Sequence, residues 1–304
     1  NGVGAFKTLR TGAMSFGRAL IAALGPVGLL VAAIAGMIAL LVATEGRVRE
    51  ISKGFGISKD TAAKLYLQIS RIQTSLGNQL ALYEDIVTVM QKMTEQSGLI
   101  LFGSDKVISK VANIGKQLGY GVEQATELHG TLMQMGAGEE LAANMQLVAA
   151  KMAEAEGFAP GIITKDMVEN ADRLQEYFYG YPKQMIQATI QIRKMGISVS
   201  QATKMADSLL DIESSLTAQF EASAAIGRQI NLDKARQYAI EGKLAEMAQE
   251  VTNQIGSAAD FTAMQWPQRR LLAKALGMEV GELTKSLFIQ EKLAKLPEEQ
   301  RKEA

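Results

Sequence analysis

The residue types needed for catalysis or metal binding are scarce in this chain of 304 residues. There is no cysteine, which excludes disulfides and thiolate metal sites, and the only histidine is His129, in the stretch TELHGTLMQMG. One histidine and scattered carboxylates cannot supply a nucleophile, a base and an orienting group. The sequence also contains no Walker glycine loop, no HExxH motif and no dinucleotide fingerprint. We therefore expect a protein that is not an enzyme and that holds no metal and no cofactor.

The charge balance restricts the partners. The chain has 32 basic and 32 acidic residues, so its formal net charge is zero. Proteins dedicated to nucleic-acid binding usually carry a basic excess. We expect no sequence-specific nucleic-acid partner.

One long uncharged run stands out near the amino terminus. Between Arg18 and Glu45 there is no charged residue. At a rise of 1.5 Å per residue, the stretch from Ala19 to Ala43 is long enough to cross the roughly 30 Å hydrocarbon core of a bilayer. Basic Lys7, Arg10 and Arg18 precede it without an acid, which favours a cytoplasmic amino-terminal side if it inserts.

The run also has features of a segment that packs against copies of itself. A helix break is expected at Gly25-Pro26, with a second weak point at Gly36, and alanines leave a smooth surface for close helix approach. The alternative is a helix buried permanently inside an assembly. The residues expected to face lipid or other copies are Leu20, Ile21, Leu24, Gly25, Pro26, Val27, Leu29, Leu30, Val31, Ile34, Gly36, Ile38, Leu40, Leu41 and Val42.

The remainder of the chain has the apolar periodicity of helices and few prolines, so the predicted fold class is all-α: an extended helical array with one long apolar helix and no sheet. The only stretch that could be extended is Gly98 to Gly103. We expect an apolar segment at 1–46 and a helical body at 47–304, with a sub-boundary near 157–163. Helices are predicted at 59–76, 78–96, 105–118, 122–135, 139–155, 165–178, 182–195, 199–226, 232–241, 243–255, 258–264, 268–276 and 280–295.

A short pattern occurs four times in the body. A basic residue is followed after three positions by glycine, then an apolar or aromatic residue, with Ala or Leu six positions after the glycine. This layout predicts a helix, a glycine cap, a buried residue and a second helix. The copies read KGFGISKDTAAKL, KQLGYGVEQATEL, RKMGISVSQATKM and KALGMEVGELTKS, and their corner glycines are Gly56, Gly119, Gly196 and Gly277.

The same layout occurs in DNA-binding helix-turn-helix units. The second helix of each copy here carries Gln, Thr, Glu and Met rather than a basic face, which favours plain helical corners. Unequal spacing between the copies also argues against a regular solenoid.

The stretch from Phe220 to Leu293 resembles a segment of the tail tape measure proteins of tailed bacteriophages. The matching residues are Asn231-Leu-Asp-Lys-Ala-Arg236, Gly256-Ser-Ala-Ala-Asp-Phe261 and Leu272-Ala-Lys-Ala-Leu-Gly-Met278. Trp266-Pro267 departs from the polar residues more usual at that place. The Ala/Gly-rich run ALGPVGLLVAAIAG is also typical of the family. Because the chain begins at Asn1 rather than Met, we expect it to be either processed or part of a longer chain, and its end, LPEEQRKEA, favours the second.

The resemblance implies a structural role in a virion. Tape measure proteins are mainly helical, are held as oligomers inside the tail tube and set the tail length. They leave the tail before the genome and help it to cross the host inner membrane. The implied partners are copies of the chain with three- or six-fold symmetry, tail tube and baseplate hub proteins, and the host inner membrane. The implied locations are the tail lumen and, during infection, the inner membrane and periplasm.

Two other classes of function are compatible with the sequence. A membrane-inserting translocator or pore-forming toxin would also join one apolar segment to a helical body. A helical scaffold or adaptor would keep Ala19 to Ala43 buried at all times.

Overall fold

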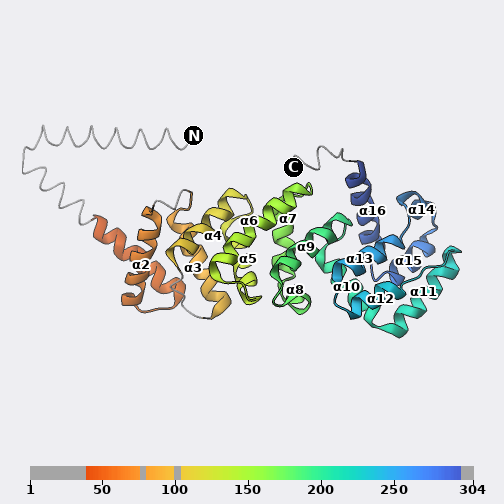
Figure 1. Ribbon diagram of the computed structural model, residues 1–304. Helices are drawn as coiled ribbons and strands as arrows, with labels where there is room; N and C mark the ends of the chain where they lie inside the picture. The colour runs from red at the N-terminus through yellow and green to blue at the C-terminus, as the bar shows by residue number, and fades with distance from the viewer. Residues whose placement is uncertain (1–38, 76–79, 99–103, 296–304) are drawn as a thin grey trace, which may run out of the picture. The chain divides into compact units, whose positions relative to one another are not determined.

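The computed structural model describes residues 39–75, 80–98 and 104–295 (Figure 1). Every regular element in these ranges is a helix and none is a strand, which confirms the predicted all-α class. The chain divides into two compact units, residues 1–70 and 71–304, with the division inside α2 (Lys59–Thr74). The possible extended connector at Gly98 to Gly103 lies largely outside the described residues.

In the first unit, the described residues form helix 39–55, a corner at Gly56 and most of α2. Ile51 of the first helix and Leu65 of the second are buried. The predicted boundary at residue 46 lies in the interior of helix 39–55. The apolar segment and the body are therefore joined by continuous helix.

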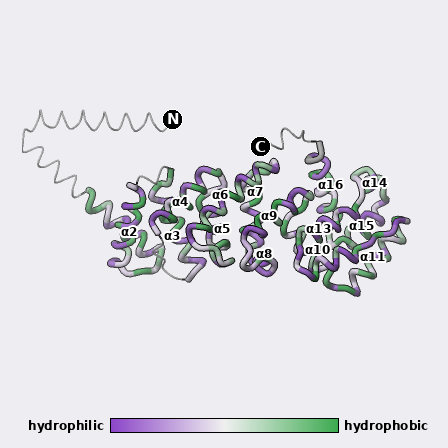
Figure 2. Tube along the Cα trace, in the orientation of Figure 1, coloured by the Kyte–Doolittle hydropathy of each residue, from purple (hydrophilic) through white to green (hydrophobic). Residues whose placement is uncertain are grey.

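The second unit contains the remaining helices, and hydrophobic and hydrophilic residues alternate along them (Figure 2). Their bounds are α3 (Tyr83–Ser97), α4 (Asp105–Gln117), α5 (Val122–Gln134), α6 (Glu139–Ala155), α7 (Pro160–Glu169), α8 (Ala171–Phe178), α9 (Pro182–Lys194), α10 (Val199–Leu210), α11 (Ile212–Ile226), α12 (Asp233–Ile240), α13 (Leu244–Asn253), α14 (Ala258–Ala263), α15 (Trp266–Ala275) and α16 (Val280–Lys295).

From α3 to α7, each helix contacts the next one along the chain and the one after it. Local packing of this kind is typical of helices stacked in sequence. This packing between neighbours in sequence is not kept in the last third of the chain, where α11 packs mainly on α15. The sequence-based sub-boundary near 157–163 coincides with the connection from α6 to α7, and the buried cluster continues across it.

Two predicted helices are each divided in the structure. The helix expected at 165–178 is wrong as a single element, because Asn170 leaves helical geometry and its side-chain Nδ2 donates to the carbonyl of Asp166. The helix expected at 199–226 is interrupted at Asp211, whose carboxylate accepts from the backbone N–H of Ser214 and so caps α11. Short polar side chains that bond nearby backbone compete with helix continuation.

Two helices of the second unit begin with a capping box. Ser198 accepts from the backbone of Gln201 and Gln201 accepts from the backbone of Ser198, and the same exchange links Ser257 with Asp260. Each box satisfies backbone donors that the first turn of a helix leaves unpaired. These boxes fix where α10 and α14 begin.

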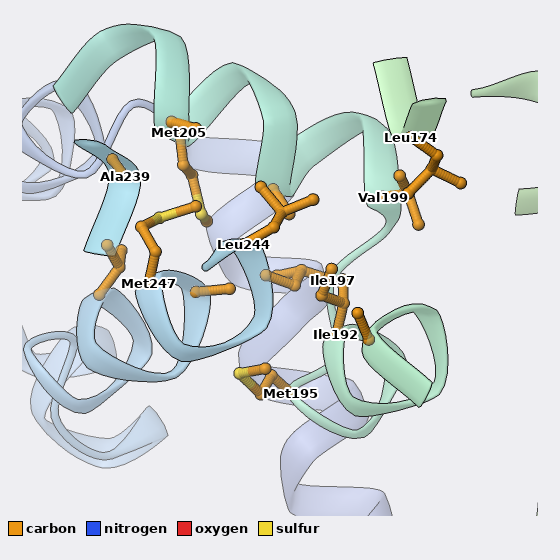
Figure 3. Packing of buried hydrophobic residues seen from close by; sticks show 14 of the residues in the cluster. Leu174, Ile192, Met195, Ile197, Val199, Met205, Ala239, Leu244 and Met247 are labelled. Carbon is orange, nitrogen blue, oxygen red and sulfur yellow. The ribbon is translucent and has the colours of Figure 1, made fainter. Parts of the chain in front are cut away.

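The core of the second unit is built from methionine, leucine, isoleucine and alanine. In Figure 3, Met205 of α10 and Met247 of α13 point toward one another, and both are fully buried. Unbranched methionines fill irregular gaps between helices that cross at different angles. Met205 and Met247 can therefore adapt to the space between α10 and α13.

Candidate functional site

The apolar segment is described only at its carboxyl end. Leu40, Leu41 and Val42 lie in the first turns of helix 39–55 with exposed fractions of 69%, 65% and 64%. The start of this helix is coloured hydrophobic in Figure 2. The other predicted segment residues, Leu20 to Ile38, and the expected kink at Gly25-Pro26 lie outside the described residues.

Within the residues that the structure describes, no helix combines the length and the apolar character needed to cross a membrane. The described part of the chain thus gives no support to the expected long apolar helix. It does contain an apolar helical end that is exposed, at Leu40, Leu41 and Val42.

The four corner glycines have the backbone geometry expected of a glycine cap. The φ angles of Gly56, Gly119, Gly196 and Gly277 are 64°, 71°, 74° and 68°. This left-handed region is costly for any residue with a Cβ atom. Each glycine lies between two helices.

The pattern also fixes a buried position in each second helix. The residue six positions after each glycine is fully buried in all four copies: Ala62, Ala125, Ala202 and Leu283. The residue directly after the glycine varies more. Ile197 and Met278 are buried, whereas Ile57 and Tyr120 are half-buried.

The third and fourth copies of the pattern pack reciprocally. A Cβ atom on Gly196 would lie 2.5 Å from the backbone oxygen of Ser286, and one on Gly277 would lie 3.1 Å from the Cα of Met205. Ser286 is nine residues after Gly277, and Met205 is nine residues after Gly196. Each corner thus rests against the equivalent turn of the other copy.

Two side-chain hydrogen bonds reinforce this contact. Ser286 Oγ and Gln290 Nε2, both on α16, donate to the carbonyl oxygen of Met195 at 3.2 and 2.6 Å. That carbonyl belongs to the end of a helix, where backbone acceptors lack intrahelical partners. The corners at Gly56 and Gly119 differ, because nothing lies within 4 Å of a Cβ placed there.

His129 is fully buried on α5, and burial lowers its pKa to about 4. Neither ring nitrogen has a hydrogen-bond partner among the described residues. A neutral imidazole without an orienting group is not arranged as a general base. In the same ranges, no group of three or more His, Asp or Glu side chains is placed to hold a metal ion.

The residues that carry the family resemblance have structural roles. Arg236 is buried on α12 and donates to Ser215 Oγ, Asp233 Oδ1 and Gln219 Oε1. The later motifs supply the Ser257–Asp260 capping box, buried Phe261 and the Gly277 corner. These motifs therefore take part in the packing of α11 to α16.

A groove of about 850 Å³ lies between α9 and α13, with α8 and α12 at its sides, and the sequence reasoning missed it. Its lining includes Tyr177, Tyr181 and Tyr238 together with carboxamides on α9 and α13. The available signal was the aromatic stretch YFYGYP followed by glutamines at helical spacing.

Comparison with known proteins does not place the chain in a group. No family model matches it, and no curated protein and no solved structure is similar to it.

Proposed function

We propose that the chain is a tail tape measure protein of a tailed bacteriophage. In this proposal it is a structural oligomer inside the tail tube and baseplate hub, and it sets the tail length. It is released from the tail to help the genome across the host inner membrane. It catalyses no reaction in any of these steps.

The observation that carries the proposal is the apolar helical end at Leu40, Leu41 and Val42. These residues close an uncharged run that begins after Arg18, and in the single chain they are exposed. Apolar surface left in water costs about 25 cal/mol per Å², so a run of this length requires a cover. Copies of the chain around an axis, tube and hub proteins, or lipid can each supply it.

The helical body supports the same proposal in two ways. It contains the stretch from Phe220 to Leu293 that resembles tape measure proteins, and this stretch folds as part of α11 and α12 to α16. The body also offers no metal cluster in its described residues and a histidine without an orienting group. A structural role agrees with both features.

The expected assembly is a symmetric homo-oligomer. Alanine and glycine positions in the apolar run allow identical helices to approach closely, and closed symmetry is the rule for identical subunits. A three- or six-fold bundle would bury the run in the stored virion. The same run would contact the inner membrane after release.

The proposal is tested in the genome that encodes the chain, which we expect to be that of a tailed phage. Inactivating the reading frame should give heads without tails of defined length, and in-frame deletions should shorten the tail. Replacing Leu30 and Ile34 by Asp should leave particles that assemble poorly or fail to deliver DNA, because each charge costs about 2.5–3.5 kcal/mol at a bilayer centre. Tails of normal length without the chain would overturn the proposal.

A vesicle assay separates the two alternatives. The purified chain should not release dye from vesicles by itself, whereas a pore-forming toxin would. It should nevertheless partition onto vesicles, and a permanently buried scaffold helix would not.

A further inference from the structure

The last helix of the described chain, α16, is held to the second unit by few buried side chains. Within residues 280–292, Leu283, Ser286 and Leu287 are buried, whereas the other residues are half-buried or exposed. The shorter helix α10 buries more of its residues, namely Val199, Ala202, Thr203, Met205, Ala206 and Leu209. Elements with little buried apolar surface open at a lower free energy than the core. This difference predicts that α16 opens before the rest of the second unit.

The polar contacts of α16 converge on one backbone group. Ser286 Oγ and Gln290 Nε2 both donate to the carbonyl oxygen of Met195, at 3.2 and 2.6 Å. Because the two donors share one acceptor, both hydrogen bonds are lost together when the helix moves away. Lys204 and Glu282 approach to 3.9 Å, and an ion pair at this distance with an exposed lysine contributes little to stability.

The surface beneath α16 fits a particular helix. A Cβ atom on Gly196 would lie 2.5 Å from the backbone oxygen of Ser286, so the two backbones are in direct contact there. Leu283 and Leu287 belong to the same buried cluster as Met195. We call the surface that comprises Gly196 and the Met195 carbonyl the α16 seat. It fits a helix with leucine at positions 283 and 287, serine at 286 and glutamine at 290.

The connection from α15 to α16 provides a hinge. Gly277 in this connection rests on α10, because a Cβ atom placed on it would lie 2.8 Å from Ser208 Cβ and 3.1 Å from Met205 Cα. This contact belongs to the connection and not to α16, so it can persist when the helix swings out. Met278 and Glu279 follow the glycine and precede α16. A few residues at the end of an element are enough to absorb such a backbone change.

We propose that α16 is a detachable strap, and that its seat, once open, binds α16 of a second copy of this chain. The occupant follows from the structure, because the seat already holds this helix and a second copy carries an identical one. Exchange of an identical element between copies is a low-cost route to association. A helix without the serine and the glutamine would leave the Met195 carbonyl without either donor. This inference does not depend on the proposed role in a phage tail.

A labelled, capped peptide with the sequence of residues 278–295 tests the seat in the 1–304 chain. Fluorescence anisotropy should show saturable binding, with an affinity reduced by the fraction of chains whose strap is closed. The Ser286→Ala/Gln290→Ala chain should bind the wild-type peptide about tenfold more tightly, because its own α16 competes less well. A peptide with the same two substitutions should bind about tenfold more weakly to either chain.

Thr284→Ala in the chain is the matched control. Thr284 is exposed on α16, and its hydroxyl donates to the Val280 carbonyl of the same helix. This variant should bind the peptide as the wild type does. Both variants should keep the helical circular-dichroism spectrum of the wild type, which excludes a general folding defect. Equal affinity of the wild type and the Ser286→Ala/Gln290→Ala chain, or no binding to either, would overturn the strap.

Association between copies tests the occupant. Sedimentation velocity of the wild-type chain should show association that rises with concentration. Excess wild-type peptide should reduce this association, and the doubly substituted peptide should reduce it much less. Association that the wild-type peptide leaves unchanged, or a chain that stays monomeric although the peptide binds, would overturn the second copy as the occupant of the seat.

Discussion

Arg193 and Asp166 form a two-point ion pair that joins α9 to α7. Arg193 Nε donates to Asp166 Oδ2, and Arg193 Nη2 donates to Asp166 Oδ1 at 2.6 Å. The carboxylate is almost completely buried, whereas the guanidinium is partly open to solvent. A second pair, Arg173 with Asp207, joins α8 to α10 at the surface, where Arg173 Nη2 donates to both carboxylate oxygens at 2.5 and 2.6 Å.

The two pairs should differ in their effect on stability. Asp166→Asn removes one partner of a largely buried pair and should lower the free energy of unfolding by about 2–4 kcal/mol. Asp207→Asn breaks the exposed pair and should cost less than about 1 kcal/mol. Urea unfolding followed by circular dichroism measures both. Equal losses would mean that burial does not decide the strength of these pairs.

The reciprocal corners predict a difference between two glycines with similar φ. Gly196→Ala places a methyl group against the Ser286 carbonyl as well as in the left-handed region, and should cost about 3 kcal/mol. Gly119→Ala meets open space and should cost about 1 kcal/mol from backbone strain alone. Thermal or urea unfolding of both variants checks this. A loss for Gly119→Ala as large as that for Gly196→Ala would contradict the reciprocal contact.

His129 predicts a dependence of stability on pH. Because burial lowers its pKa from 6.5 to about 4 in the folded chain, its contribution is fully present above pH 6.5 and is lost as the pH falls toward 4. Between pH 7 and pH 5 this amounts to about 2 kcal/mol. The measurement is urea unfolding of the wild type and of His129→Leu at both pH values.

Comparing the wild type with His129→Leu separates the contribution of the histidine to the pH dependence of stability. Carboxylates titrate in both, so only the difference between the two pH slopes is assigned to His129. The variant should lose about 2 kcal/mol less than the wild type between pH 7 and pH 5. Identical slopes would mean that the imidazole is reached by water in the folded state.

The exposed end of the apolar run should contribute to membrane partition. Replacing Leu40 and Leu41 by Asp should reduce flotation of the chain with anionic vesicles, since charged side chains are expensive at an apolar membrane surface. Leu67→Asp is the control, because Leu67 on α2 is 67% exposed and lies outside the run. Unchanged flotation of the Leu40–Leu41 variant would show that this end does not meet lipid.

The sequence predicted most helices to within a few residues, because glycine caps, capping boxes and apolar periodicity are local signals. The ends of α5, α6 and α9 follow directly from Gly136, Gly157 and Gly196, all at positive φ. The breaks at Asn170 and Asp211 were missed, since both residues are tolerated within helices and only their side-chain hydrogen bonds end the helix.

The candidate sites were less predictable from sequence. The repeated pattern located four corners, but the pairing of Gly196 with Ser286 joins residues 90 positions apart and has no local signal. The groove also depends on long-range packing, which brings Tyr181 of one region near Tyr238 of another. Spacing along α9 could indicate that its glutamines share one face, but it could not indicate that α13 forms the other wall of the groove.

The reciprocal packing of the corners at Gly196 and Gly277 makes the order of unfolding depend on which end of the chain is drawn out first. A pull from the carboxyl end reaches α16 first, and losing α16 removes both the Ser286 contact at Gly196 and the donors to the Met195 carbonyl. When the amino end enters a narrow channel first, α2 to α8 come before α9 along the chain and would unfold before this contact is reached. The contact between the Gly196 corner and α16 is thus lost early when the carboxyl end leads and late when the amino end leads. A chain drawn lengthwise through a narrow channel would lose its structure in a different order depending on which end leads.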